Sequence, residues 1–294
     1  MGNYEKACET LDKIGKWQNE KLPEALPSQT RISAEIFYNA IGLPQVPAIL
    51  SLIVGLFAFV AGVLGFKKDW IWTAYAGISL VYLLLLIGLR WWISGHLPMT
   101  SGFEMMLLIA CLAFGITLAN ARRRPYFLPL GILMGGFATL VSSMSRSNPQ
   151  IGSLMPVLSS PLLCLHVSSM MISYTLFGLV ALNSLTGLVK RDHSRVCADR
   201  SALLLYPALF TLVTGTILGS VWANISWGRY WTWDPKETWS LITILVYALP
   251  IHSRSLRIFK RPTIFNIYCL LAFASVLFTY FGVNYLLGGL HSYA

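Results

Sequence analysis

The chain has 294 residues, of which 55% are hydrophobic and only 12% charged, and its mean hydropathy is +0.62. A soluble domain usually carries about twice that share of charged residues, so the composition excludes a soluble globular protein and indicates an integral membrane protein. The net charge of +10 does not indicate a nucleic-acid-binding protein, because the basic residues are divided among four short loops between apolar segments.

Eight apolar segments follow one another along the chain. A transmembrane helix needs roughly 20 apolar residues to cross the ~30 Å hydrocarbon core of a bilayer. The runs are continuous rather than alternating, which excludes a β-barrel. We therefore predict an all-α polytopic membrane protein with about eight transmembrane helices. The segments are 47–66, 70–92, 103–121, 126–144, 161–189, 201–222, 238–253 and 263–285.

Lys and Arg gather in every second loop, at 67–68, 122–124, 190–200 and 254–261, whereas the intervening loops contain few. The basic loops of membrane proteins are the cytoplasmic ones. Both termini should therefore lie outside, together with the loop that follows the sixth segment.

Residues 1–45 are polar to amphipathic and show no pattern of a cleavable signal peptide. The expected organisation is an outer N-terminal segment, 1–45, followed by a transmembrane domain, 46–294. The five cysteines have no C-x-x-C spacing and most lie in apolar segments, so neither a disulfide framework nor a zinc site is expected.

Two of the five histidines are expected near the outer face of the membrane. His166 comes five residues after Pro161, where the fifth segment enters from outside, so it lies under ~10 Å below the surface. His291 follows the outer end of the last segment, in "GVNYLLGGLHSYA". Both imidazoles are thus available on one side of the membrane.

The other histidines have different surroundings. His252 ends the seventh segment, fifteen residues after Glu237, or roughly 22 Å further along a helix toward the cytoplasmic side. An ionisable group inside a bilayer indicates a site or a pathway; the alternative is a histidine that caps the end of its helix. His96, in the outer turn "SGHLPMTSGFE", and His193, in the inner loop "KRDHSR", occupy positions typical of structural or solvated residues.

The segment "WGRYWTWDPKETW", residues 227–239, holds four of the ten tryptophans, and Trp222 precedes it. A belt of aromatic residues at the membrane–water interface explains isolated Trp residues. It does not explain a Trp-rich loop that also contains Gly, Asp, Pro, Lys and Glu. Paired neutral imidazoles are axial ligands for an iron porphyrin, and Trp rings stack on the apolar faces of the macrocycle. We therefore favour a heme-binding surface, formed by Trp rings that stack on the porphyrin, over an interfacial aromatic belt.

The charged residues of this segment suit the edge of such a ligand. Arg229 and Lys236 can pair with heme propionates, as cations pair with carboxylates. Asp234 and Glu237 either orient an imidazole or Arg229, or simply anchor the loop.

The same residues resemble a known family. "WGRYWTWDPKETW" is similar to the tryptophan-rich WWD segment of heme-handling proteins in cytochrome c maturation, in the form of the CcsA/ResC branch, the system II cytochrome c synthase. "SPLLCLHVSSMMISYTLF" and "FGVNYLLGGLHSYA" resemble the family segments that hold the outer heme-ligand histidines. "YALPIH" resembles the segment of the intramembrane heme histidine, and "GHLPMTSGFE" resembles an outer G-H-x-P loop. The resemblance covers roughly residues 50–294.

The resemblance implies two positions for heme b. His166 and His291 would ligate an outer heme iron, and His252 would ligate a heme within the bilayer, together with a histidine from a CcsB/ResB-like partner. Residues 1–45, with "YEKACETLDKIGKWQ", look like the end of an outer domain of that partner in fused relatives. The WWD segment spans 222–239. The candidate heme-binding residues are His96, His166, Trp222, Trp227, Arg229, Tyr230, Trp231, Trp233, Asp234, Lys236, Glu237, Trp239, His252 and His291.

The implied function is the heme-handling subunit of a holocytochrome c synthase of the heme lyase type, which acts with a ResB/CcsB-like membrane protein. It moves heme across the membrane, holds it, and supports thioether attachment to the C-x-x-C-H segment of an apocytochrome c. Catalysis is expected to be positional, with no acid or base residue. A heme exporter without covalent chemistry and a b-type heme subunit for electron transfer remain open as alternatives. The expected location is the bacterial inner membrane, with the heme site on the periplasmic face, and a plastid thylakoid membrane is the alternative.

Overall fold

The computed structural model describes residues 4–21, 26–41, 44–65, 69–121, 127–144, 150–151, 160–252 and 255–287. The chain divides into two compact units, residues 1–42 and 43–294. In its described part, the first unit consists of α1 (Tyr4–Lys21) and α2 (Gln29–Ile41), and no residue of either helix is buried. The relation of residues 1–45 to an outer domain stays a prediction.

The second unit contains only helices and loops in its described residues, and each of the eight apolar segments coincides with a helix. Six of these helices, α3, α4, α5, α7, α8 and α10 with its continuation, are long and apolar enough to cross a membrane. The other two are shorter, with 15 residues in α6 and 17 in α9. The predicted all-α polytopic membrane protein is confirmed. The helices are α3 (Gln45–Leu64), α4 (Asp69–Ser94), α5 (Gly102–Asn120), α6 (Leu128–Ser142), α7 (Pro161–Val189), α8 (Ser194–Trp227), α9 (Pro235–Ile251) and α10 (Pro262–Leu277), with the short 3₁₀ turns η3 (Arg191–His193) and η4 (Arg257–Lys260).

Two of the helices differ from what the apolar segments predict. α10 continues as η5, a π-helix of 10 residues (Phe278–Leu287), so the eighth segment is not one regular α-helix. π-helices are rare and occur frequently at functional sites. α8 is 34 residues long and begins at Ser194, inside the basic loop, rather than at residue 201.

Local sequence signals explain where several helices begin and end. At the start of α5, the Ser101 hydroxyl accepts the backbone N–H of Glu104, and the Glu104 carboxylate accepts the N–H of Ser101, which forms a capping box. α8 ends at Trp227, and the C-cap residue Gly228 has a φ of 72°, in the left-handed region that glycine adopts without steric cost. α7 and α9 begin with proline. The first backbone N–H groups of a helix have no hydrogen-bond acceptor within the helix, so the missing N–H of proline costs nothing at this position.

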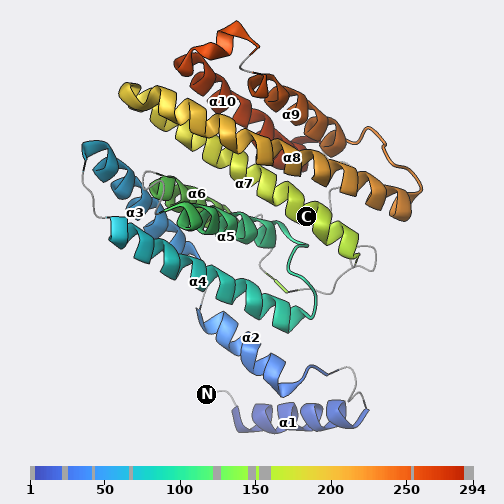
Figure 1. Cartoon of the computed structure of the whole chain (residues 1–294). Coiled ribbons are helices and arrows are strands. Elements are labelled where there is room, and N and C mark those ends of the chain that lie inside the picture. Colours follow the sequence, from blue (N-terminus) through green and yellow to red (C-terminus); the bar gives the residue numbers. More distant parts are fainter. Residues whose placement is uncertain are drawn as a thin grey trace. The chain divides into compact units, whose positions relative to one another are not determined.

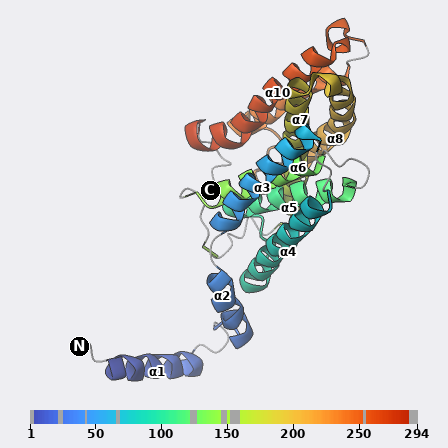
Figure 2. The same cartoon turned by 90° about the vertical axis from the view of Figure 1, so that its left-hand side faces the viewer.

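α7 is the central helix of the second unit, since it contacts α5, α6, α8 and α10 (Figure 1). Figure 2 shows α4 and α10 on opposite sides of this unit. α7 and α8 form an antiparallel hairpin that buried polar side chains tie together, as is common between membrane helices. Ser173 donates to the carbonyl of Ala208 at 2.9 Å, and Asn183 donates to the carbonyl of Cys197 at 2.8 Å and to the hydroxyl of Ser201 at 2.9 Å.

One end of this unit gathers the C-terminal parts of α4 and α8, the N-terminal parts of α5, α7 and α9, and η5. A buried ion pair joins two of these helix ends. Arg90 Nη2 lies 2.9 Å from Glu104 Oε1, and the two side chains are 1% and 5% exposed. The other carboxylate oxygen of Glu104 accepts the backbone N–H of Thr100 at 2.9 Å. The pair therefore fixes the turn before α5 to the end of α4.

Candidate functional site

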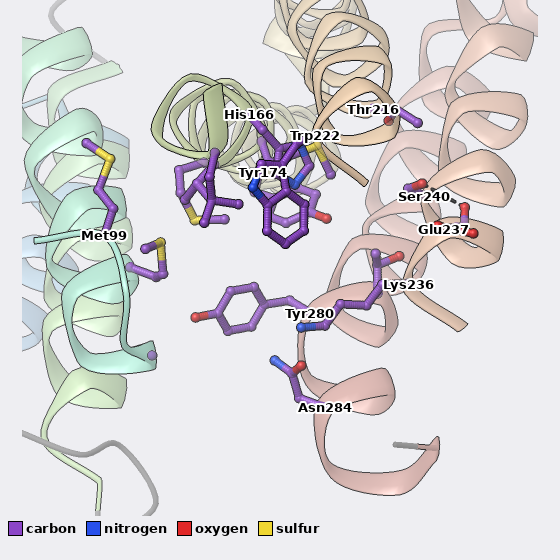
Figure 3. Close-up of a pocket in the computed structure, with 18 of the residues that line it drawn as sticks. Met99, His166, Tyr174, Thr216, Trp222, Lys236, Glu237, Ser240, Tyr280 and Asn284 are labelled. Carbon is purple, nitrogen blue, oxygen red and sulfur yellow. Dashed lines mark hydrogen bonds between the residues drawn. The ribbon is translucent and has the colours of Figure 1, made fainter. Parts of the chain in front are cut away.

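A cavity of about 230 Å³ lies among these helix ends (Figure 3). Its walls come from the turn before α5, from α7, α8 and α9, and from η5. A mostly apolar cavity with a few convergent polar groups is typical of a ligand site. The predicted site residues that line it are His166, Trp222, Trp231, Lys236 and Glu237.

His166 projects from the second turn of α7 and packs against α8. Its Nδ1 lies 2.7 Å from the carbonyl oxygen of Gly215. Because a carbonyl can only accept, Nδ1 carries the proton, and in the neutral ring Nε2 keeps its lone pair. Metal-ligating histidines commonly show this arrangement, with the other ring nitrogen donating to a carbonyl. The contact therefore fixes the orientation of the His166 ring against α8.

A glycine one turn further along α8 makes room for this imidazole. A Cβ at Gly219 would lie 2.6 Å from Cε1 and 2.7 Å from Nδ1 of His166, closer than real Cβ atoms approach. Gly219 and the Gly215 carbonyl thus hold the ring against α8. Sequence reasoning missed Gly219. The available signal was the four-residue spacing of these glycines, since small residues at that spacing let membrane helices approach closely.

Sequence reasoning also missed the thioethers of the cavity. Met99, Met105, Met170 and Met171 line it, from the turn before α5, from α5 itself and from α7. The Ser168 hydroxyl donates to the sulfur of Met99 at 3.3 Å, which links α7 to that turn. Met side chains are flexible and polarizable, so they adapt to an irregular apolar ligand.

The Trp-rich segment contributes only part of its aromatic rings to the cavity. Trp222, which is 3% exposed, and Trp231 line it. Trp227 packs edge-to-face on Trp222 with ring centroids 6.3 Å apart, and Trp233, which is 70% exposed, packs in the same way on Trp231 at 5.9 Å. The outer rings therefore support the lining rings. The segment's predicted residues outside the lining are Trp227, Arg229, Tyr230, Trp233, Asp234 and Trp239, and the last of these packs on Phe278 with centroids 4.1 Å apart.

The two carboxylates of the segment hold the loop to the start of α9. Asp234 is the N-cap and accepts the backbone N–H of Lys236 at 2.9 Å. Glu237 Oε2 accepts the backbone N–H groups of Thr232 at 2.8 Å and of Asp234 at 3.2 Å. These contacts form a capping box, and they support the anchoring alternative for both residues.

Lys236 brings a cation to the cavity, and it precedes the apolar segment 238–253. Burial lowers the pKa of Lys236 to about 8, while the nearby charge of Asp234 acts in the opposite direction. Figure 3 shows the side chain extending toward Tyr280 and Asn284. An anionic ligand placed beside Lys236 would favour its charged form, so this side of the cavity suits a carboxylate.

Neither His96 nor His252 lines this cavity. His96 places Nδ1 3.2 Å from the carbonyl of Leu97, and its buried Nε2 has no hydrogen-bond partner among the described residues. His252 is the exposed C-cap of α9, at the opposite end of that helix from Lys236. His291 lies outside the described residues, four positions after the end of η5. The ligand roles of the histidines stay predictions.

Metal coordination by protein side chains alone is not indicated in the described residues, which contain no group of three or more His, Cys, Asp or Glu that could hold an ion. A porphyrin iron differs, because the macrocycle occupies the equatorial positions and the protein supplies only axial ligands. A single well-oriented imidazole such as His166 is compatible with that requirement.

Comparisons with known proteins match the part of the chain that contains the cavity residues. The sequence pattern of the family described as "Cytochrome C assembly protein" matches residues 99–291. The chain is 37% identical to Protein NrfI of Wolinella succinogenes, over 99% of this chain and 34% of NrfI. It is 33% identical to the cytochrome c biogenesis protein CcsA of Chlamydomonas reinhardtii, over 74% of this chain and 66% of that protein. For CcsA of Guillardia theta the identity is 30%, over 83% of this chain and 93% of that protein.

A solved structure shows a similar fold. The cytochrome c heme lyase CcmF has a TM-score of 0.62 and 16% identity, over 87% of this chain and 48% of the CcmF chain. At this identity the likeness concerns the fold alone. The chain therefore spans about a third of NrfI and about half of CcmF.

Proposed function

Because the chain belongs to the cytochrome c assembly protein family, we propose that it is the heme-handling component of a system II cytochrome c synthase. The family gives it a role in cytochrome c biogenesis, and its apolar helices make it a membrane protein. In this proposal the chain receives heme b from the cytoplasmic side, holds it at the outer cavity, and presents it to the C-x-x-C-H segment of an apocytochrome c.

The arrangement of His166 carries the proposal. The carbonyl of Gly215 directs the lone pair of Nε2, and Gly219 leaves space for the ring. Trp222, Trp231 and the methionines supply an apolar surface beside it. A flat iron porphyrin needs these features together: an axial nitrogen, aromatic stacking and exclusion of water.

The second outer ligand in this proposal is His291. It follows η5 by four residues, and η5 lines the cavity through Thr279, Tyr280 and Asn284. Only four positions in the sequence therefore separate the end of η5 from His291. The residues that bind the ring and its edge are proposed to be Trp222, Trp231 and Lys236, with Trp227, Trp233 and Trp239 as supports.

His252 is proposed to hold heme before it reaches the cavity. It lies at the far end of α9, so about 16 helical residues, or roughly 24 Å, separate it from Lys236. Its side chain is exposed at the C-cap, which leaves it accessible to a ligand shared with another protein. A ResB/CcsB-like membrane protein is proposed to supply the second axial ligand there.

The bond-forming step adds each cysteine thiol across a heme vinyl group. The S–C bond forms at one vinyl carbon, the thiol hydrogen goes to the other, and the addition itself involves no net oxidation or reduction. We propose that an apocytochrome histidine displaces one axial ligand and so brings its two cysteines to the vinyl groups. The contribution of the chain is then orientation, which can supply a large effective molarity.

We place the cavity on the periplasmic face of a bacterial inner membrane. The opposite helix ends carry the basic loops at 190–200 and 254–261. Basic loops lie on the cytoplasmic side, so the cavity faces outward in this orientation.

The test is to co-express the chain with a ResB/CcsB-like partner and a c-type apocytochrome, and to measure covalent heme on denaturing gels. We expect His166→Ala to lose covalent heme, and added imidazole to restore part of it by filling the vacated ligand position. His193→Ala, in the exposed turn η3, is the matched control and should behave as wild type. A His166→Ala variant that keeps the wild-type heme spectrum and shows no effect of imidazole would count against axial ligation.

The same experiment separates the alternatives. A heme exporter delivers heme without thioether product, so it would give non-covalent heme only. A b-type electron carrier would show reversible reduction and oxidation of a tightly held heme with no transfer to the apocytochrome.

A further inference from the structure

A second cavity, of about 340 Å³, lies between two groups of helices in the transmembrane unit. Its walls come from α3, α5 and α6 in the first group and from α7, α10 and η5 in the second. Where the groups meet, α5 and α6 contact α7. The boundary between the groups is therefore packed along α7 and leaves a cavity beside α10.

The lining of the second cavity is apolar. Among the described residues that form it, Tyr174 and Tyr280 alone carry a side-chain oxygen or nitrogen, and the others are aliphatic residues, Phe, Met, Ala and Gly. Both tyrosines also line the cavity beside His166, and their rings lie edge to face with centroids 6.3 Å apart. This tyrosine pair is thus part of the wall that the two cavities share.

The second cavity lies at the depth of the hydrocarbon core of a bilayer. On α7 its lining residues run from Tyr174 to Leu182, and on α10 and η5 they run from Leu270 to Phe281. Each of these positions is at least six residues, or roughly 9 Å, from the nearest end of its membrane-spanning helix. Lipid headgroups lie outside the ~30 Å hydrocarbon core, so only the hydrocarbon part of a lipid reaches this depth.

The cavity is open toward the lipid-facing surface on one side and closed on the other. Phe137 of α6 and Leu277 of α10 line it and are 52% and 39% exposed. Exposed apolar side chains at this depth face lipid rather than water. On the α7 side, every residue from Ser173 to Ala181 is buried. The space is therefore continuous with the interior of the bilayer and ends against α7.

Neither water nor heme suits this lining. A buried water needs 2–4 polar partners, and an apolar cavity of about 150 Å³ already stays dry and binds apolar molecules. A heme would bring two propionates, which pair with cations. The described residues of the lining include no histidine, lysine or arginine. The chemistry of the walls favours a ligand made of hydrocarbon alone.

The shape of the cavity favours a single chain over a helix of another protein. The lining of α7 extends over eight residues, or roughly 12 Å, so the mean cross-section of the cavity is roughly 28 Å². A helix about 10 Å across has a cross-section of roughly 79 Å². Met106 and Met134 line the cavity, and their flexible side chains can adapt to a thin apolar chain.

We propose that the second cavity is a binding site for one acyl chain of a membrane phospholipid. The chain enters from the bilayer past Phe137 and Leu277 and packs against α7 and the tyrosine pair, while the headgroup stays outside the protein. It fills the space behind the wall that the tyrosine pair forms for the cavity beside His166. The site does not depend on the proposed function.

The test uses the purified full chain in lipid discs that contain a phosphatidylcholine with a photoactivatable diazirine in one acyl chain. After illumination, peptide mass spectrometry locates the label. A label on residues 173–181 of α7 requires a chain inside the cavity, because this segment is buried. Label on α4, where Ile78 and Val81 are 72% and 67% exposed, measures the general contact with lipid.

Three variants with the same substitution complete the test. Ala181→Phe and Ala138→Phe place a phenyl group in the cavity from α7 and from α6. Ala274→Phe makes this change at an exposed position of α10 outside the lining and is the matched control. We expect label on residues 173–181 in wild type and in Ala274→Phe. Either filled variant should lose most of this label and keep the label on α4.

Absence of label from residues 173–181 in wild type would overturn the proposal, and this result does not depend on how any variant folds. Unchanged label in a filled variant that still melts cooperatively would overturn it as well. Competition identifies the occupant. Excess unlabelled phosphatidylcholine should remove the label. If an isoprenoid quinone or a co-expressed ResB/CcsB-like partner removes it and phosphatidylcholine does not, the cavity belongs to that occupant and the proposal fails.

Discussion

Replacement of Gly219 by alanine tests how the site holds its imidazole. The new Cβ would lie 2.6 Å from Cε1 of His166, whereas ordinary contacts begin near 3.4 Å, so the ring must retreat by roughly 0.8 Å, the difference of the two. That shift lengthens the 2.7 Å contact between Nδ1 and the Gly215 carbonyl beyond hydrogen-bonding range. Metal–ligand distances tolerate only about 0.2 Å of error. We therefore expect Gly219→Ala to lose heme ligation as fully as His166→Ala does.

The assay is the absorption spectrum of the purified variant together with its yield of covalent heme on an apocytochrome. Gly115→Ala is the matched control, because it makes the same change within α5 at a position where an added Cβ meets nothing within 4 Å. The control should be neutral or slightly stabilised, since alanine favours a helix over glycine by about 1 kcal/mol. A Gly219→Ala protein with a wild-type spectrum and wild-type product would refute the reasoning about the ring.

The remaining predictions concern other parts of the same end of the protein. Affinity for heme, whose propionates are carboxylates, should fall as the pH rises through about 8, because Lys236 loses its proton there. Lys236→Met should remove this step in a binding titration. Trp231→Ala should weaken heme retention by roughly 2- to 10-fold through lost stacking worth about 0.5–1.5 kcal/mol, while Trp233→Ala, which removes only a ring that supports Trp231, should weaken it less in the same spectral assay. Glu104→Leu should destabilise the fold by about 3–5 kcal/mol because it removes the carboxylate that compensates the buried charge of Arg90. The double variant Arg90→Met with Glu104→Leu should regain much of that loss in thermal unfolding, and a double variant as unstable as the single one would contradict this.

The transmembrane helices were predictable because apolar residues run without interruption over each of them. The same pattern could not reveal η5, since a π-helix and an α-helix of this composition are equally apolar. It also could not give the start of α8, because the basic residues after Ser194 read as a loop although they continue the helix. Helix boundaries therefore depended on local hydrogen bonding that hydrophobicity does not report.

The candidate site was predictable where a short local pattern carried it, in the Trp-rich segment and at His166 in the second turn of its helix. Trp222, Trp231 and Lys236 stand close together in the sequence, and they line one cavity. Within the same motif, the pattern Asp-Pro-x-Glu already signalled a capping box at Asp234, with proline at the first helical position. Asn284 and the methionines reach the cavity from separate helices, and no local pattern predicts that convergence.

The α7–α8 hairpin has a consequence for how the cavity can open. His166 is bonded to α8, and the bonds from Ser173 and Asn183 tie the same two helices together further down. The imidazole is thus held between α7 and α8, and we expect it to move only when these two helices move together. We therefore expect a change in the size of the cavity to shift the other walls, from η5, the start of α9 and the turn before α5, relative to these two helices.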